Sequence, residues 1–272
     1  MLPTIDKDTV LCMSLSGRPG NTGTRFHNYL YRELGLNFLY KAFTTKDLPG
    51  AIAGIRALGI RGCAVSMPCK EACIPFLDRL TDSAAAIRSV NTIVNDDGHL
   101  TAYNTDYIAV EKLIARHAVA PDTPFALCGS GGMAKAVASA LRDAGFRQGT
   151  IVARNEATGR ALAESCGYDW RADLGTLRPA MLVNVTPVGM AGGPEAEDLS
   201  FPEAAVAAAE TVFDVVALPV ETPLVRLARR LGKRVIDGGE VITLQALEQF
   251  VLYTGIRPEE ELVRRAAEYA RG

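Results

Sequence analysis

The sequence predicts an α/β protein of two domains, the second built on a parallel sheet with helices on both faces. Three observations lead to this prediction. The chain has 272 residues, which is more than one typical domain contains. Short apolar runs alternate with helical segments along nearly all of its length. A glycine-rich turn lies between an apolar strand and a helix near the middle, at 125–141.

The first hundred residues predict an α/β domain of their own. A helix follows each of the first two strands, and the first helix carries Phe26 and Leu30 on one face. A hairpin is expected at 92–103, around the turn Asp96-Asp97-Gly98. The strands before it are expected at 10–14, 37–43 and 62–67.

Beyond the glycine-rich turn, apolar runs at 181–185, 211–216 and 234–237 alternate with helical segments, which is typical of a parallel sheet. Ligands of such sheets bind at the carboxyl ends of the strands. Two last helices, at 242–253 and 259–270, exceed what a nucleotide domain needs, so we expect them to pack on the first domain. The predicted domains are 1–104 together with 239–272, and 105–238.

The glycine-rich turn fits the pattern G-x-G-x-x-[G/A] with Gly129, Gly131 and Ala134. The first glycine permits the tight turn, the second lets the backbone approach a pyrophosphate, and the helix N-terminus then faces the phosphates. Val137 and Leu141 continue the apolar face of the helix. A plain tight turn is the alternative to a Rossmann-type dinucleotide site. The predicted cofactor residues here are Gly129, Ser130, Gly131, Gly132, Met133 and Ala134.

The residue after the next strand favours NADP over NAD. A carboxylate at this place usually binds the ribose 2′-hydroxyl of NAD, whereas an arginine accommodates the 2′-phosphate of NADP. The strand at 150–154 ends in Arg154, followed by Asn155, and Arg160 adds a second charge. Two alternatives remain: both arginines are solvated, or Glu156 serves an NAD ribose.

Composition excludes several other classes of function. With 48% hydrophobic residues, 22% charged residues and a formal net charge of −2, the chain offers no reason to expect a nucleic acid or membrane partner. It shows no signal peptide and no 18-residue apolar span, so we expect a cytoplasmic protein. We expect it to be a monomer or homodimer. The six cysteines lack the paired spacing of a zinc site, so we expect reduced thiols and no metal.

Five motifs follow one another along the chain. They are Gly62-Cys-Ala-Val-Ser-Met-Pro-Cys-Lys70, Ala86-Ile-Arg-Ser-Val-Asn-Thr92, Asn104-Thr-Asp106, Asn184-Val-Thr-Pro-Val-Gly-Met190, and Gly239 with Gln245. In order and spacing they resemble the shikimate dehydrogenase family along nearly the whole chain. The corresponding family motifs are G-x-N-V-T-x-P-x-K, A-x-x-x-x-A-V-N-T, N-T-D, N-x-T-P-x-G-M and G-x5-Q.

The resemblance implies an NADP-dependent oxidoreductase of aromatic amino acid biosynthesis that interconverts a cyclic hydroxy acid, such as shikimate or quinate, and its ketone. It makes Lys70 the catalytic lysine and Asp106 its partner. Asn91, Asn104 and Gln245 would contact the substrate. The further cofactor contacts expected after the strands of the second domain are Thr186, Val188, Val215 and Gly238.

Hydride transfer needs these residue types independently of the resemblance. Oxidation of a secondary alcohol removes hydride from carbon and a proton from oxygen, so a base must lie within hydrogen-bond reach of the hydroxyl. Lys70 can accept and return that proton, and the Asp106 carboxylate can hold the ammonium. Taken alone, a lysine and an aspartate in these positions are more often a solvated lysine and a helix N-cap, and only the family resemblance reverses this interpretation of Lys70 and Asp106.

Two departures from the family point to an altered substrate pocket. The family motif S-x-S-P-x-x-H-N, whose serines bind the substrate carboxylate, ends here in His27-Asn28, but Asn21 and Gly23 replace the serines. Thr22 and Arg25 are the substitutes we expect to bind a carboxylate, with Arg18 as an alternative to Arg25. The other interpretation is that these arginines are surface charges on a glycine-containing loop. In the family motif D-x-V-Y-N-P, tyrosine and asparagine become Ala217-Leu218. These changes favour the shikimate dehydrogenase-like branch.

Two other classes of function stay open. One is a non-redox NADP-binding sensor or scaffold with a vestigial site, which the altered pocket favours and the retained Lys70 and Asp106 oppose. The other is a different enzyme on similar architecture, such as a folate-linked dehydrogenase or a lyase.

Overall fold

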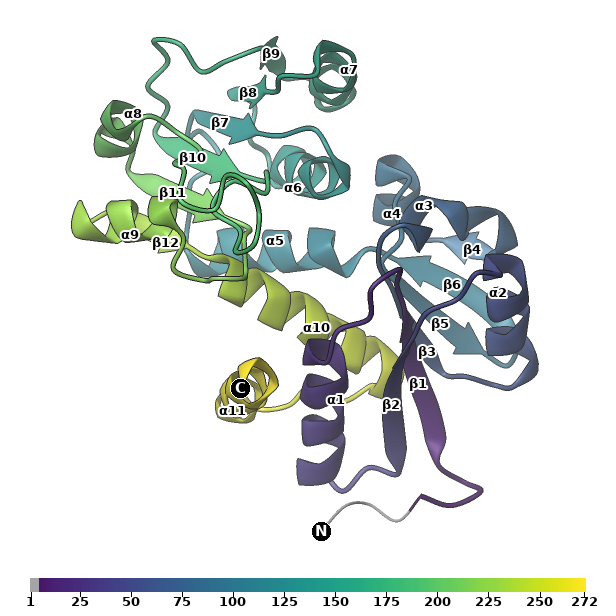
Figure 1. The fold of residues 1–272 in the computed structure, drawn as a ribbon. Coiled ribbons are helices and arrows are strands. Elements are labelled where there is room, and N and C mark those ends of the chain that lie inside the picture. Colours follow the sequence, from purple (N-terminus) through teal and green to yellow (C-terminus); the bar gives the residue numbers. More distant parts are fainter. Residues whose placement is uncertain (1–4) are drawn as a thin grey trace. The chain divides into compact units, whose positions relative to one another are not determined.

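The computed structural model describes residues 5–272 and divides into two compact units (Figure 1). One unit runs to Thr105 and resumes at Thr243–Gly272, and the other comprises Asp106–Ile242. Both boundaries fall inside helices, namely α5 (Thr105–Arg116) and α10 (Gly238–Thr254). Helix α10 begins at Gly238, before the predicted segment 242–253. Its first turn was not predicted, because Gly238 and Gly239 have low helix propensity.

The first unit holds a mixed sheet of six strands in the order β2-β1-β3-β5-β6-β4. Strand β1 pairs in parallel with both β2 and β3, whereas β5 pairs antiparallel with β3 and with β6. The β5–β6 hairpin turns at Asp97 and Gly98, both at positive φ, as predicted from the turn sequence. The strands are β1 (Val10–Leu15), β2 (Phe38–Phe43), β3 (Gly62–Val65), β4 (Arg79–Leu80), β5 (Thr92–Asp96) and β6 (His99–Tyr103).

Alternate residues of these strands face two different cores. Met13 and Cys63 face Ile52 and Ile55 of α2 in one buried cluster. On the other side, Tyr40 stacks on His27 of α1. Helix α1 also packs against α11, the last helix of the chain. The helices of this unit are α1 (Thr22–Glu33), α2 (Leu48–Ala57), α3 (Cys69–Ala72), α4 (Asp82–Ile87) and α11 (Glu260–Arg271), with a 3-10 turn η1 (Ile74–Phe76).

Gly62, which opens the lysine-bearing motif, lies directly under a ring of α10. A Cβ built on Gly62 would come within 2.2 Å of Cδ1 of Tyr253, so a side chain here would displace the ring. Tyr253 in turn lies against His27, with ring centroids 5.8 Å apart. The glycine therefore permits α10 to pack closely on β3.

The second unit is a parallel sheet of six strands in the order β12-β11-β10-β7-β8-β9. Numbered within the unit, this is the Rossmann-type order 6-5-4-1-2-3, which confirms the predicted fold class. The strands are β7 (Phe125–Cys128), β8 (Gly149–Val152), β9 (Asp169–Arg171), β10 (Met181–Asn184), β11 (Thr211–Asp214) and β12 (Arg234–Ile236).

Helices cover both faces of this sheet. Leu182 and Val212 pack with Leu224 of α9 and Val206 of α8 in one buried cluster. Helix α6 buries its alanine-rich face, and helix α7 packs on α6 and β8. The helices that belong wholly to this unit are α6 (Gly132–Asp143), α7 (Glu156–Cys166), α8 (Glu203–Ala208) and α9 (Pro223–Arg230).

Several boundaries differ from the sequence prediction. The predicted strand at 62–67 ends at Val65, and the strand expected to end in Arg154 ends at Val152. After β3 the chain turns at Met67 and Pro68, and after β8 it leads to Asn155, the N-cap of α7. The strands β4 and β9 were not predicted, since neither contains a run of apolar residues. In the described part of the chain, no helix has the length and apolarity to span a membrane.

Candidate functional site

Lys70 lies in the short helix α3, which follows β3. Its neighbours Cys69 and Cys73 are buried in the core of the first unit and hold the helix in place. The carbonyl oxygen of Lys70 accepts a hydrogen bond from the N–H of Val90 at 3.0 Å. This bond joins the lysine segment to the residue before Asn91, so the structure brings two predicted site residues together.

The side chain of Asn91 is oriented by three hydrogen bonds to its oxygen. Oδ1 accepts from the N–H of Thr105 at 2.8 Å, from the hydroxyl of Thr105 at 3.2 Å and from the hydroxyl of Thr92 at 2.9 Å. Because the oxygen is occupied, the Nδ2 amino group is the part of Asn91 suited to bind a ligand.

Two residues that the sequence did not single out complete this arrangement. Thr105 orients Asn91, and its hydroxyl also lies 3.5 Å from Oε1 of Gln245. Gln249, one turn after Gln245 on α10, donates to the carbonyl oxygen of Asn91 at 3.3 Å and to the hydroxyl of Thr92 at 3.1 Å. The i, i+4 spacing of the two glutamines was the available signal.

Asn104 is buried and has a clear structural contact. Its Nδ2 donates to the carbonyl oxygen of Ser89 at 2.9 Å, which fixes the segment leading to Asn91. The predicted substrate residues Asn91, Asn104 and Gln245 thus belong to one connected region of the first unit.

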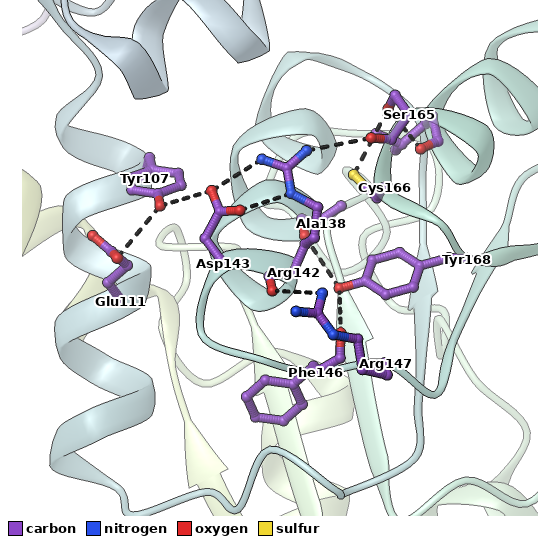
Figure 2. A network of polar contacts seen from close by, with 11 residues as sticks. Tyr107, Glu111, Ala138, Arg142, Asp143, Phe146, Arg147, Ser165, Cys166 and Tyr168 are labelled. Atoms are coloured by element: carbon purple, nitrogen blue, oxygen red, sulfur yellow. Dashed lines mark hydrogen bonds and ion pairs between the residues drawn. The ribbon is translucent and has the colours of Figure 1, made fainter.

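Asp106 directly follows Thr105 and is the first residue of the second unit. The next residue, Tyr107, anchors this end of α5 to α6 (Figure 2). Its hydroxyl donates to Oδ2 of Asp143 at 3.0 Å, and Asp143 also accepts from Nε of Arg142 at 2.7 Å. The hydrogen bond from Arg142 lowers the pKa of Asp143, and burial and the hydrogen bond to Asp143 raise the pKa of Tyr107.

Arg142 extends the same network to α7, where its guanidinium donates to the carbonyl oxygen of Ser165 at 3.3 Å (Figure 2). The first turn of α5, which carries Asp106, is therefore attached to the scaffold of the Rossmann-type unit.

The start of α1 holds the predicted carboxylate-binding residues. Thr22 and Arg25 are both exposed and lie in its first turn. Asn28 has a structural role, since its side chain both accepts from the N–H of Tyr40 at 2.9 Å and donates to its carbonyl oxygen at 2.8 Å. His27 is fully buried, and burial lowers its pKa to about 3. The pair His27-Asn28 thus supports α1 rather than offering polar atoms to a ligand.

The glycine-rich turn has the geometry that a pyrophosphate requires. Gly129 has a φ of +126°, and a Cβ there would lie 2.9 Å from Cγ2 of Val185. A Cβ on Gly131 or Gly132 would meet no atom within 4 Å, so the backbone is open to a ligand at the start of α6. The first turn of α6 carries no acidic side chain, which leaves its N-terminal dipole suited to an anion.

Next to this turn, two hydroxyls join the glycine segment to α7. Ser130 and Thr158 lie 2.8 Å apart, Oγ to Oγ1, and Asn155 caps α7 by accepting from the N–H of Thr158 at 3.1 Å. Thr158 was not predicted, because only the fold shows that it faces Ser130.

The two predicted arginines differ in their surroundings. Arg154 is 85% exposed and its Nη1 lies 3.7 Å from Oε1 of Glu195. Arg160 donates to Glu156 at 2.8 Å and its guanidinium lies 4.3 Å from the ring centroid of Trp170. Both arginines therefore have an acidic partner, and Arg154 is the more exposed of the two.

Asp214 connects the loops after β10 and β11, where further cofactor contacts were predicted. Its carboxylate accepts from Asn184 at 2.9 Å and from the hydroxyl of Thr222 at 2.6 Å. Burial raises the pKa of Asp214 to about 6, although these donors lower it. Asn184 in turn accepts from the hydroxyl of Thr186 at 2.6 Å, which fixes the start of the 186–190 loop.

The remaining predicted cofactor residues lie at the same edge of the sheet. Val188 and Val215 are half-buried in the loops after β10 and β11, and Gly238 begins α10. A Cβ on Gly238 would lie 2.1 Å from the carbonyl oxygen of Val216, so close packing of the backbone requires glycine at this position.

A cavity of about 530 Å³ lies at the opposite edge of this sheet. Its lining includes Phe125 and Gly149, which begin β7 and β8, and the exposed Arg147 and Arg178. Because ligands of parallel sheets bind at the carboxyl ends, this cavity is separate from the predicted cofactor site.

The fold and the glycine-rich turn define the class: an α/β protein with a Rossmann-type unit and a separate mixed-sheet unit. Comparison with known proteins agrees. The family model of the shikimate dehydrogenase substrate binding domain matches residues 22–93. A shikimate dehydrogenase-like protein of Haemophilus influenzae is 58% identical over 267 residues, which cover 98% of each chain.

A shikimate dehydrogenase (NADP(+)) of Pyrococcus abyssi is 36% identical over 253 residues, covering 89% of this chain and 90% of that protein. The solved structure of a shikimate 5-dehydrogenase from Thermus thermophilus in complex with NADP(H) and shikimate matches with a TM-score of 0.83. It has 29% sequence identity and covers 96% of this chain and 99% of that chain. The chain therefore belongs to the shikimate/quinate dehydrogenase family, in its shikimate dehydrogenase-like branch, as the motifs predicted.

Proposed function

We propose that the protein is an NADP-dependent oxidoreductase that interconverts a cyclic secondary alcohol acid and its ketone, with Lys70 and Asp106 as the acid–base pair. The observation that carries the proposal is the oriented Asn91, whose oxygen is held by Thr105 and Thr92 and whose backbone neighbour Val90 is bonded to Lys70. A donor held next to a lysine suits a substrate that carries several hydroxyls.

Lys70 would accept the hydroxyl proton at Nζ during oxidation of the alcohol and return it to the carbonyl oxygen during reduction. Asp106 would stabilise the ammonium form of Lys70 between these steps. Asn91 and Gln245 would orient the ring by binding its other hydroxyls. Bound NADP would supply the hydride acceptor, and NADPH the hydride donor.

NADP is the cofactor named for the Pyrococcus and Thermus proteins, and the residues present here suit it. The open backbone at Gly131 and the N-terminus of α6 would bind the pyrophosphate. Arg154 would pair with the 2′-phosphate, next to the hydroxyls of Ser130 and Thr158.

The substrate carboxylate would bind at the first turn of α1. The N–H groups of this turn and the guanidinium of Arg25 offer donors to an anion where the family has serines. A carboxylate bound in this different way, together with Ala217 and the exposed Leu218 in place of tyrosine and asparagine, favours a related acid over shikimate itself.

The replacement of the family's tyrosine and asparagine by Ala217 and Leu218 also favours the second candidate, a non-redox NADP-binding sensor or scaffold. This candidate retains the glycine-rich turn and Arg154 but requires no proton transfer by Lys70.

Initial rates with NADP or NAD, crossed with shikimate, quinate and other cyclic hydroxy acids, test the proposal when the absorbance of the reduced cofactor is followed. We expect NADP-dependent turnover that Lys70→Ala abolishes and that Lys46→Ala, which changes an exposed lysine in the same unit, retains. NADP binding without turnover of any acid would instead favour the sensor. Turnover that survives substitution of both Lys70 and Asp106 by Ala would place the chemistry elsewhere.

A further inference from the structure

The carboxylate of Glu195 lies in the part of the molecule where the proposed NADP site would bind its 2′-phosphate. Glu195 belongs to the loop between β10 and α8, and Arg154 follows β8, so the fold brings together residues 41 positions apart in the chain. Their charged groups are 3.7 Å apart, Nη1 to Oε1. At this distance the two form an ion pair without a short hydrogen bond.

The backbone of Glu195 is held in place. Its carbonyl oxygen accepts from the N–H of Gly189 at 2.9 Å and from the N–H of Asp198 at 3.2 Å. Gly189 has a φ of +86°, and a Cβ there would lie 3.2 Å from Cβ of Thr222, so this part of the loop is packed against the start of α9. The backbone that carries this carboxylate is therefore held in a defined position.

Both charges act on the end of β7. Cys128, directly before Gly129, has its pKa raised to about 11 by burial, while the charge of Arg154 lowers this pKa and that of Glu195 raises it. Arg154 and Glu195 are thus both close enough to influence the residue that enters the glycine-rich turn. The side chain of Glu195 is only 35% exposed, which limits screening of its charge by solvent.

We propose that Glu195 is a specificity-determining residue, which competes with the 2′-phosphate of NADP for Arg154 and thereby limits the preference for NADP over NAD. The inference rests on the proposed cofactor site. A 2′-phosphate must replace Glu195 at the guanidinium and approach a like charge, whereas NAD has a 2′-hydroxyl and leaves the ion pair intact. Arg154 is 85% exposed, so its side chain can exchange partners.

Binding titrations of the full chain with NADPH and with NADH, followed by fluorescence of its single tryptophan, Trp170, or by calorimetry, test this inference. Glu195→Gln should tighten NADPH binding roughly two- to fivefold, the range for an exposed ion pair, and leave NADH binding unchanged. The gain should shrink as salt concentration rises. In an Arg154→Gln background, the same substitution should have less than about half of this effect, since the competition is gone.

The matched control is Glu197→Gln in the same loop, because Glu197 is 89% exposed and lies 3.6 Å from Arg226 instead. It removes the same charge without touching Arg154, so it should leave the NADPH to NADH affinity ratio unchanged. Equal changes for both cofactors, an unchanged ratio in Glu195→Gln, or a full effect in the absence of Arg154 would each overturn the inference. Failure of the unaltered protein to bind either cofactor would instead contradict the proposed function.

Discussion

Asn91 and Thr105 are joined twice, because Oδ1 of Asn91 accepts from both the N–H and the hydroxyl of Thr105, at 2.8 and 3.2 Å. Thr105 is the middle residue of the Asn104-Thr-Asp106 motif and begins α5. The threonine of this motif therefore fixes the orientation of the Asn91 amide.

Thr105→Val should weaken use of the acid substrate. Valine keeps the shape and the N–H but removes the hydroxyl, so Asn91 loses one of the bonds that orient it, a contribution of about 1 kcal/mol. We expect kcat/KM for the acid to fall by roughly fivefold, while the Kd for NADPH stays unchanged. Thr105→Ser, which retains the hydroxyl, is the control and should preserve most of the activity. Equal kinetics of the two variants would show that the hydroxyl does not position Asn91.

His27 should make the protein sensitive to acid. Its pKa is about 3 in the folded protein, against an ordinary value of 6.5, so the unfolded chain takes up the proton first as pH falls. The stabilising effect of keeping His27 neutral is present above pH 6.5 and is lost progressively between pH 6.5 and about 3, at up to about 1.4 kcal/mol per pH unit.

His27→Phe preserves the stacking on Tyr40, at a centroid separation of 4.4 Å, without a titratable group. Denaturant unfolding across this pH range should therefore give a shallower loss of stability for the variant than for the unaltered protein. His99→Gln, at an exposed position of β6, is the control and should leave the slope as it was. Superimposable pH profiles of His27→Phe and the unaltered protein would refute the assignment.

Asp214 should affect stability in the opposite direction to His27, since its ionisation destabilises the folded protein as pH rises. Its folded pKa is raised from 3.8 to about 6, so its effect on stability is fully present below pH 3.8 and is lost as pH rises through 6. Asp214→Asn removes this ionisation while retaining an oxygen to accept from Asn184 and Val216.

Relative to the unaltered protein, the asparagine variant should gain up to on the order of 3 kcal/mol of unfolding free energy between pH 4 and pH 7. Chemical denaturation at these two pH values measures the change. Asp173→Asn, at an exposed position, should show no such gain. A gain of the same size at pH 4 would mean that the variant stabilises the fold for another reason.

Local patterns made the fold predictable. Apolar runs gave the strands of both sheets, the Asp97-Gly98 pair gave the hairpin, and Gly129, Gly131 and Ala134 gave the Rossmann-type turn, because each depends on neighbours in the chain. Strands β4 and β9 were missed because neither Arg79–Leu80 nor Asp169–Arg171 contains a run of apolar residues.

The site was predictable in its residue types and less so in its geometry. The family motifs named Lys70 and Asn91, but the bonds from Thr105 and Gln249 to Asn91 depend on how the chain folds around the start of β5. The pairing of Arg154 with Glu195 depends on a loop that returns to the end of β8, and spacing along the chain carries no sign of it.

Gly23→Ser should increase the affinity for shikimate. Gly23 occupies the position of a family serine in the first turn of α1, and a Cβ built there lies 3.5 Å from the hydroxyl oxygen of Tyr40, an ordinary contact that a serine can make. Its hydroxyl would add a donor for the substrate carboxylate. We expect KM for shikimate to fall by about tenfold or more, because one hydrogen bond to a charged group contributes about 1.5–3 kcal/mol, with an unchanged Kd for NADPH. Gly20→Ser, in the loop just before α1 where a Cβ meets no atom within 4 Å, is the matched control and should leave KM unchanged. If Gly23→Ser also left KM unchanged, the carboxylate of the substrate would have to bind away from the first turn of α1.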